Sequence, residues 1–205
     1  MKNVSCRQSI VEAIGTFLLA FGVGVSVTFP PFPVPTVILA GLILGIAVYT
    51  IGPISGAQIN PAVTIGLLSI RKISIAQAIG NIVAQLIAGL IAFLLLKQLG
   101  MHNAPSADTL KSFLGELLGA FVLMWGISAV VAGKVHSAAS GITIGGSLSL
   151  GISVALFGSL GVLNPAVAIG VGAFSLFYFV APIIGALFAA QLYSYIILEK
   201  TSSKK

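Results

Sequence analysis

Six apolar segments, each long enough to cross a lipid bilayer, constrain the fold of this chain more than any other feature. A membrane-spanning helix needs about 20 consecutive apolar residues. Such segments occur at about 9–29, 36–52, 74–97, 110–132, 138–157 and 174–197, and two shorter ones at about 60–69 and 164–172. Only 7% of the 205 residues are charged, whereas soluble domains carry roughly a quarter. The sequence therefore predicts an all-α membrane protein with six spans.

Lysine and arginine residues indicate how the chain is oriented in the membrane. Because the number of spans is even, both termini lie on the same side. If that side is the cytoplasm, the basic residues inside are Lys2, Arg7, Arg71, Lys72, Lys134, Lys200, Lys204 and Lys205. Only Lys97 and Lys111 then lie outside, in agreement with the positive-inside rule. This topology accounts for the net charge of +6, so we expect cytoplasmic termini and no nucleic-acid partner.

The two halves of the sequence match each other at an offset of 104 residues. Glu12 falls on Glu116, and Asn-Pro-Ala-Val at 60–63 falls on the same four residues at 164–167. Each repeat contains three spans, so the second repeat enters the membrane from the opposite side. Inverted repeats place their functional site at the interface between the halves, near the midplane. We expect one domain over 1–205, with repeat one at about 9–97, a loop at about 98–109 and repeat two at about 110–197.

The triplets Asn60-Pro61-Ala62 and Asn164-Pro165-Ala166 each predict the start of a short helix. Asparagine is a favoured N-cap residue, and proline is favoured at the first helical position, where its missing N–H is not needed. The two short apolar stretches are therefore expected to be half-helices. The segments before them, 52–59 and 158–163, are expected to enter the membrane as non-helical chain, which survives only where it is buried or lines a water-filled path.

The inverted repeat should bring the two half-helix N-termini together from opposite sides of the membrane. Each terminus carries roughly half a positive charge, so the centre should repel cations. Each asparagine oxygen can cap its own half-helix, which turns the amide NH₂ toward the lumen. A passing water would accept hydrogen bonds from both amides, and this orientation would interrupt a proton wire. The resulting hypothesis is a path for small uncharged molecules.

Several motifs together give the chain a resemblance to a known family. They are the paired triplets, the preceding Ser55-Gly56-Ala57, Glu-x-x-Gly at the start of both repeats, and Pro182-Ile-Ile-Gly185-Ala186 in the last span. The chain resembles the aquaporin, or major intrinsic protein, family over essentially its whole length. The resemblance implies a right-handed bundle of six transmembrane helices plus two re-entrant half-helices, in an inverted 3+3 repeat. It also implies a homotetramer in the lipid bilayer, with one pore per subunit for water and small neutral solutes.

Glu12 and Glu116 are ionisable residues inside predicted spans and need partners there. Such residues usually face the interior of the bundle, and the resemblance implies that these two accept hydrogen bonds from the re-entrant loops. No nucleophile or base accompanies them, so we expect no enzymatic activity, and we expect no cofactor or metal. Gln85 and Gln191, on the third and sixth spans, are expected to hydrogen-bond between helices.

The sequence departs from the family pattern at the outer selectivity filter. The resemblance places the four filter positions on Ala40, Ile152, Gly161 and Val167, and most members carry an arginine where this chain has Val167. All four side chains are small or apolar, so we expect a wider filter that admits glycerol and rejects protons and cations less strongly. Gln58, where members often have histidine, is expected to supply a hydrogen-bond donor to the inner vestibule.

A secondary transporter built on the same inverted repeat is the main alternative. Such transporters usually carry ion-coordinating residues near the midplane, whereas the midplane here is predicted to contain asparagine, proline and alanine. A membrane enzyme or a purely structural junction protein fits the paired triplets less well. Short loops favour the plasma membrane of a prokaryote. The identity of the permeant solute remains open.

Overall fold

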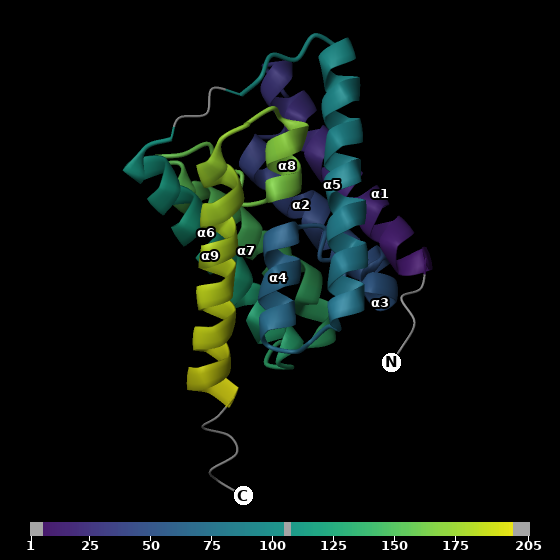
Figure 1. Cartoon of the computed structure of the whole chain (residues 1–205), viewed down its shortest axis with the longest axis vertical. Helices are drawn as coiled ribbons and strands as arrows, with labels where there is room; N and C mark the ends of the chain where they lie inside the picture. The colour runs from purple at the N-terminus through teal and green to yellow at the C-terminus, as the bar shows by residue number, and fades with distance from the viewer. Residues whose placement is uncertain (1–5, 105–107, 199–205) are drawn as a thin grey trace, which may run out of the picture.

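The computed structural model describes residues 6–104 and 108–198, and these fold as helices joined by short loops, with no strand among them. Figure 1 shows the long helices arranged around two short ones at the centre. The helices are α1 (Cys6–Thr28), α2 (Thr36–Thr50), α3 (Gly52–Ser55), α4 (Pro61–Ser69), α5 (Ile75–Gln98), α6 (Leu110–Val131), α7 (Ser140–Ala155), α8 (Pro165–Gly170) and α9 (Leu176–Tyr193). A 3₁₀ turn (Ser137–Ala139) precedes α7, and a π-helical turn (Ser194–Leu198) follows α9.

Five of the predicted spans correspond to helical segments that are long and apolar enough to cross a membrane. The remaining predicted span, at about 36–52, is α2. It has 15 residues and ends at Thr50 rather than at residue 52 as predicted. Pro53 explains this end, because its ring and missing N–H do not allow the helix to continue through that turn. Lys2, Lys200, Lys204 and Lys205, which support the predicted orientation, lie outside the described residues, as do residues 105–107 of the predicted loop.

The segment between α2 and α4 differs from the sequence-based expectation. The whole of 52–59 was expected to be non-helical, but Gly52–Ser55 forms the one-turn helix α3, so that prediction is wrong. Pro53 sits in the first turn, where proline is tolerated, and Gly56 ends the helix in the left-handed conformation at φ 95°. The equivalent segment of repeat two, 158–163, contains no helix.

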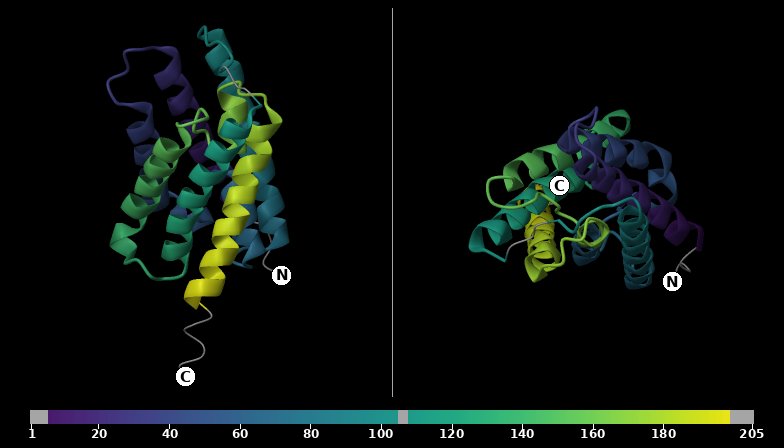
Figure 2. Two further views of the ribbon diagram at one scale, coloured as in Figure 1. Left: turned by 90° about the vertical axis from the view of Figure 1, so that its left-hand side faces the viewer. Right: turned by 90° about the horizontal axis from the view of Figure 1, so that it is seen from above.

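The half-helices α4 and α8 lie one above the other in the middle of the bundle (Figure 1). Residues Ile59 and Asn60 before α4, and Leu163 and Asn164 before α8, are joined by hydrogen bonds between the two repeats. The half-helix N-termini therefore meet at the centre. The start of α1 and the end of α9 lie toward the same end of the molecule (Figure 2).

The helices α2 and α7, one from each repeat, cross with their backbones in contact. A Cβ atom on Gly41 would lie 2.6 Å from the carbonyl oxygen of Gly145, and a Cβ on Gly145 would overlap the carbonyl oxygen of Gly41. Glycines allow this close approach, as small residues do at helix interfaces in membranes. The crossing joins the two repeats, because α2 belongs to the first and α7 to the second.

Candidate functional site

The two asparagines of the triplets cap the half-helices. The Oδ1 atom of Asn60 accepts a hydrogen bond from the Ala62 N–H at 2.8 Å. The Oδ1 atom of Asn164 accepts from the N–H groups of Ala166 at 3.0 Å and Val167 at 3.4 Å. Both asparagines have extended backbones, and a proline follows each at the first helical position. The side-chain oxygens thus satisfy N–H groups that a helix start leaves unpaired.

The amide nitrogens of the same asparagines join the two repeats. Asn60 Nδ2 donates to the carbonyl oxygen of Leu163 at 2.9 Å, and Asn164 Nδ2 donates to that of Ile59 at 2.9 Å. One hydrogen of each NH₂ group is used in this way, so only the other is left for the lumen. The amide NH₂ was expected to point to the lumen, but one of its two hydrogens bonds to the other repeat instead. Ile59 and Leu163 direct their carbonyls across the centre from left-handed conformations, at φ 38° and 56°.

Glu12 and Glu116 hold these unusual backbone conformations in place. Glu12 accepts hydrogen bonds from the N–H groups of Gln58 at 2.9 Å and Ile59 at 2.6 Å, and from the Ser55 hydroxyl at 2.6 Å. Glu116 accepts from the N–H groups of Val162 at 2.9 Å and Leu163 at 2.6 Å. Both carboxylates are fully buried. Strained residues persist only where the surroundings fix them, and these carboxylates supply that restraint.

The two glutamines singled out in the sequence lie in different surroundings. Gln85 on α5 is fully buried and donates to Glu12 at 2.9 Å and to the hydroxyl of Thr64 on α4 at 3.0 Å. Gln191 on α9 is exposed and donates to the carbonyl oxygen of Ser69 at 3.0 Å. Both glutamines therefore link a long helix to α4, Gln85 through Thr64 and Gln191 through Ser69.

A cavity of about 640 Å³ and a second of about 330 Å³ lie on either side of the half-helix junction. The larger cavity is lined by all four predicted filter residues, Ala40, Ile152, Gly161 and Val167, and by Asn60 and Asn164. The smaller one is lined by residues such as Tyr49, Pro53 and Ser140. Gln58 and Val63 line both cavities. The two spaces therefore adjoin at Gln58 and Val63, and together they are called the conduit below.

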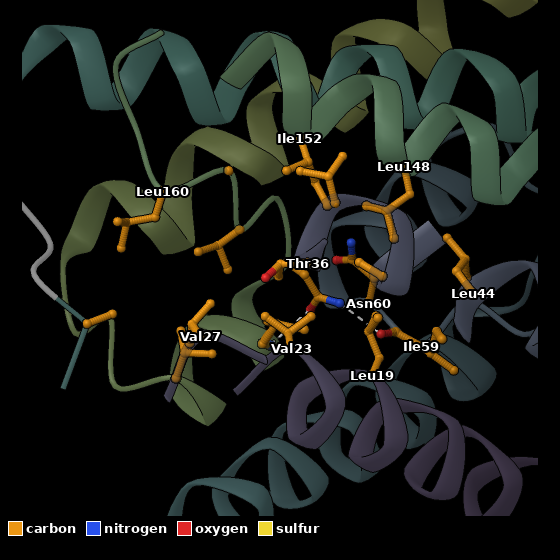
Figure 3. Close-up of a pocket in the computed structure, with 18 of the residues that line it drawn as sticks. Leu19, Val23, Val27, Thr36, Leu44, Ile59, Asn60, Leu148, Ile152 and Leu160 are labelled. Carbon is orange, nitrogen blue, oxygen red and sulfur yellow. Dashed lines mark hydrogen bonds between the residues drawn. The ribbon is translucent and has the colours of Figure 1, made fainter. Parts of the chain in front are cut away.

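The wall of the larger cavity is predominantly apolar. Figure 3 shows Leu148 and Ile152 of α7 facing Leu19 and Val23 of α1, with Asn60 between the two helices. Polar side chains gather at two levels. One level is the centre, with Gln58, Asn60 and Asn164, and the other is the mouth, with Thr28, Thr36, His102 and Asn103. Among the described residues, no Asp, Glu, Lys or Arg lines either cavity.

Val63 and Tyr49 are among the cavity-lining residues that were not singled out from the sequence. Val63 was read only as part of the repeated tetrapeptide, although the offset of 104 pairs it with the filter position Val167. Tyr49 lines the smaller cavity, and its hydroxyl donates to the carbonyl oxygen of Ala138 at 2.7 Å. The repeat offset could have identified Val63, whereas the link from Tyr49 to the turn before α7 has no local sequence signal.

This chain has an inverted pair of helical repeats and two asparagine-capped half-helices between cavities with uncharged linings. These features place it in the class of polytopic membrane channels. The chain belongs to the major intrinsic protein family, because the family model described as "Major intrinsic protein" matches residues 1–193. Members of this family are channels and not enzymes. The predicted family resemblance and the predicted aquaporin-like bundle are thus confirmed.

Relatives of the chain span nearly its full length. A protein named glycerol uptake facilitator protein-like 6, from Lactiplantibacillus plantarum, is 34% identical over 205 residues, which cover 90% of this chain and 95% of the relative. Aquaporin AqpM of Methanothermobacter thermautotrophicus is 31% identical, with 94% and 98% covered. The X-ray structure of the aquaglyceroporin from Plasmodium falciparum superposes with a TM-score of 0.75 at 24% identity and covers 96% of this chain and 98% of that one. This structural match supports the fold.

Proposed function

We propose that this chain passes water and small uncharged solutes such as glycerol, passively, through the conduit formed by its two cavities. The observation that carries the proposal is the larger cavity, in which the four predicted filter residues and both half-helix caps line one uncharged space. Apolar walls with a few fixed hydrogen-bonding groups suit solutes that carry hydroxyls on a carbon skeleton. The names of the relatives, a glycerol uptake facilitator and an aquaporin, support this choice.

The proposed roles follow the conduit from its mouth to its centre. Ala40, Ile152, Gly161 and Val167 form the outer filter, and the two Asn-Pro-Ala triplets, whose asparagines line the same cavity, form the centre. Gln58 serves the inner vestibule, while Glu12 and Glu116 support the loops. All of these act within one channel domain over 1–205, in which the repeats at about 9–97 and 110–197 each supply half of the conduit.

Rejection of cations is proposed to rest on the half-helix N-termini, which meet at the centre. Each carries roughly half a positive charge, and each capping asparagine adds one remaining amide hydrogen. A positive side chain at the outer filter would strengthen this barrier, but residue 167 is valine. We therefore expect more proton or cation leak than in a relative with arginine at that position.

The channel is proposed to work as a homotetramer in the plasma membrane of a prokaryote, with both termini in the cytoplasm. Large apolar side chains are exposed along α1 and α5, for example Ile14, Leu18, Ile87 and Leu94. In a bilayer these side chains would face lipid tails or a neighbouring subunit, and each subunit would keep its own conduit. Arg71 and Lys72, in the loop after α4, would then face the cytoplasm.

Stopped-flow light scattering on reconstituted vesicles tests this function. Vesicles are shrunk with an impermeant osmolyte and then followed during reswelling in glycerol. Reswelling faster than in protein-free vesicles supports a neutral-solute channel, and fast shrinkage without reswelling indicates a channel for water alone. Flux that saturates and depends on an ion gradient would instead favour the secondary transporter.

A further inference from the structure

The division between the two cavities lies at a polar side chain that is anchored outside the conduit. Gln58 and Val63 are the described residues that line both cavities, and Gln58 is only 3% exposed. Its side-chain Oε1 accepts a hydrogen bond from Asn81 Nδ2 at 3.1 Å. Asn81 lies on α5, is fully buried and lines neither cavity. The amide oxygen of Gln58 is therefore engaged by a group outside the conduit wall.

The amide nitrogen of Gln58 is held much less tightly than its oxygen. Gln58 Nε2 lies 3.5 Å from the carbonyl oxygen of Ser55, which is at the long limit for a hydrogen bond. An amide NH₂ group has two hydrogens to donate. At least one N–H of Gln58 is consequently free for a molecule that moves between the cavities.

The pairing with Asn81 selects this orientation over the reverse one. The Oδ1 atom of Asn81 is buried without a hydrogen-bond partner in the part of the chain that the structure describes. If both amides turned over, Gln58 would donate to that oxygen and present its own oxygen to the conduit. The two N–H groups of Asn81 would then be buried and unpaired, and buried unpaired N–H groups are rarer and less favourable than an under-used carbonyl. The observed orientation therefore leaves fewer buried N–H groups without a hydrogen-bond partner.

We propose that Asn81 is a positioning residue that fixes Gln58 with its N–H toward the conduit, and that Gln58 is a specificity-determining group of this channel, in addition to the two capping asparagines. This inference rests on the proposed function and deepens it. The four outer filter residues have no polar side-chain atoms, so they discriminate by size. Gln58 discriminates by chemistry, because it donates to the oxygen atoms of neutral solutes and offers nothing to a cation. The solute class is therefore small neutral molecules with accessible acceptor oxygens.

Glycerol flux into reconstituted vesicles tests the donor itself. Gln58→Met keeps the length of the side chain and removes the hydrogen bond, which is worth about 1 kcal/mol, so glycerol permeability should fall about fivefold. Asn81→Leu frees the Gln58 amide to sample both orientations and should lower the permeability roughly twofold. Gln191→Met makes the same chemical change at an exposed glutamine outside both cavities and should leave it unchanged. Elution volume and circular dichroism establish that each variant is folded.

Asn81→Asp tests the orientation with a readout that a purely structural role would not change. The introduced carboxylate can only accept, so it should turn Gln58 over and point the Gln58 oxygen into the conduit. Proton and rubidium leak should then rise several-fold, as a carbonyl oxygen favours cations. In the double variant Gln58→Met/Asn81→Asp the leak should return toward the wild-type value, because methionine has no oxygen to turn.

The outcomes separate the inference from the function on which it rests. A leak that persists in the double variant would come from the new charge and not from the Gln58 oxygen, and it would overturn the positioning role of Asn81. Glycerol permeability that stays within about twofold of wild type in Gln58→Met would overturn the role of Gln58 in specificity. If the wild-type protein itself passes no glycerol above protein-free vesicles, the proposed function fails, and this inference falls with it.

Discussion

The two repeats build the same re-entrant loop with different support. In repeat one the loop and α4 are surrounded by polar side chains, of which Gln58, Thr64, Asn81 and Gln85 form a connected set with Glu12. At the offset of 104, which holds from Glu12 to Gly66, the residues of repeat two that correspond to Gln58 and Thr64 are Val162 and Ala168. The buried residues of α9 include no asparagine or glutamine that could play the part of Asn81 or Gln85. The loop of repeat two is nevertheless held in an equivalent place by Glu116.

Close backbone packing and one tyrosine add support to repeat two, whereas repeat one has a connected set of polar side chains. A Cβ on Gly185 of α9 would overlap the carbonyl oxygen of Leu117 on α6, so the two helices are in backbone contact there. The Tyr178 hydroxyl accepts a hydrogen bond from the N–H of Leu160 at 3.1 Å. A buried carboxylate and an Asn-Pro cap are thus the constant parts of the design, while the surrounding support can change. The polar support of repeat one also includes Gln58, to which we assign a role in specificity.

The largest expected effect comes from removing the carboxylates that both repeats share. Glu12→Ala would leave buried donors on Ser55, Gln58, Ile59 and Gln85 without their acceptor. Each unpaired donor costs about 1–3 kcal/mol, so we expect roughly 5 kcal/mol of destabilisation. Glu116→Ala should cost less, roughly 3 kcal/mol. Thermal unfolding in detergent measures both, and Glu12→Gln and Glu116→Gln provide the ranking if an alanine variant does not fold. Equal losses would show that the polar set of repeat one adds nothing.

The shared features are also the part of the site that could be predicted from the sequence. The half-helix starts follow from local chemistry, because an N-cap and a first-turn proline act within three residues. The spans follow from length and hydropathy alone. By contrast, the bonds from Asn60 to Leu163 and from Asn164 to Ile59 join residues more than 100 positions apart. They depend on the left-handed backbone at Ile59 and Leu163, for which these residue types give no signal.

The hydrogen bond between Asn81 and Gln58 could likewise not be predicted from the sequence. Asn81 lies on a predicted span where one asparagine among apolar residues suggests only some interhelical contact. Its partner becomes clear once α5 is packed against the loop before α4. The one-turn helix α3 was likewise missed, because Gly-Pro indicates a turn as readily as a helix start. Tertiary packing decided between these readings.

A second prediction exchanges the small residue of repeat two for a larger one. Gly185→Ala places a methyl group against the Leu117 carbonyl, and over-packing of this kind costs about 1–3 kcal/mol. Asn81→Ala on α5 of repeat one should cost less, about 1 kcal/mol, because it removes a single hydrogen bond. Thermal unfolding of the two variants side by side checks the order. The reverse order would mean that close packing is not what supports repeat two.

The valines that follow the two triplets allow the two repeats to be compared within the conduit. Val167 lines the larger cavity and Val63 lines both cavities. Val167→Arg should narrow and polarise the outer filter, lower glycerol permeability about tenfold, which corresponds to about 1.4 kcal/mol, and reduce proton leak. Val167→Met adds length without charge and should lower glycerol flux without changing the leak. If the leak is the same in the wild type and in Val167→Arg, the missing charge is not a weak point of cation rejection.

The smallest expected effect comes from giving repeat two the donor of repeat one. Val162→Gln places a carboxamide at the position that corresponds to Gln58, beside the larger cavity. The buried residues of α9 include no asparagine or glutamine, so nothing equivalent to Asn81 would fix the orientation of the new amide. It should present its N–H and its oxygen about equally, and glycerol permeability should change less than twofold. Stopped-flow reswelling beside Gln58→Met measures this difference. A fivefold change in Val162→Gln would mean that a carboxamide needs no positioning partner to act on the solute, and the difference between the repeats would then lie in the conduit wall and not in Asn81.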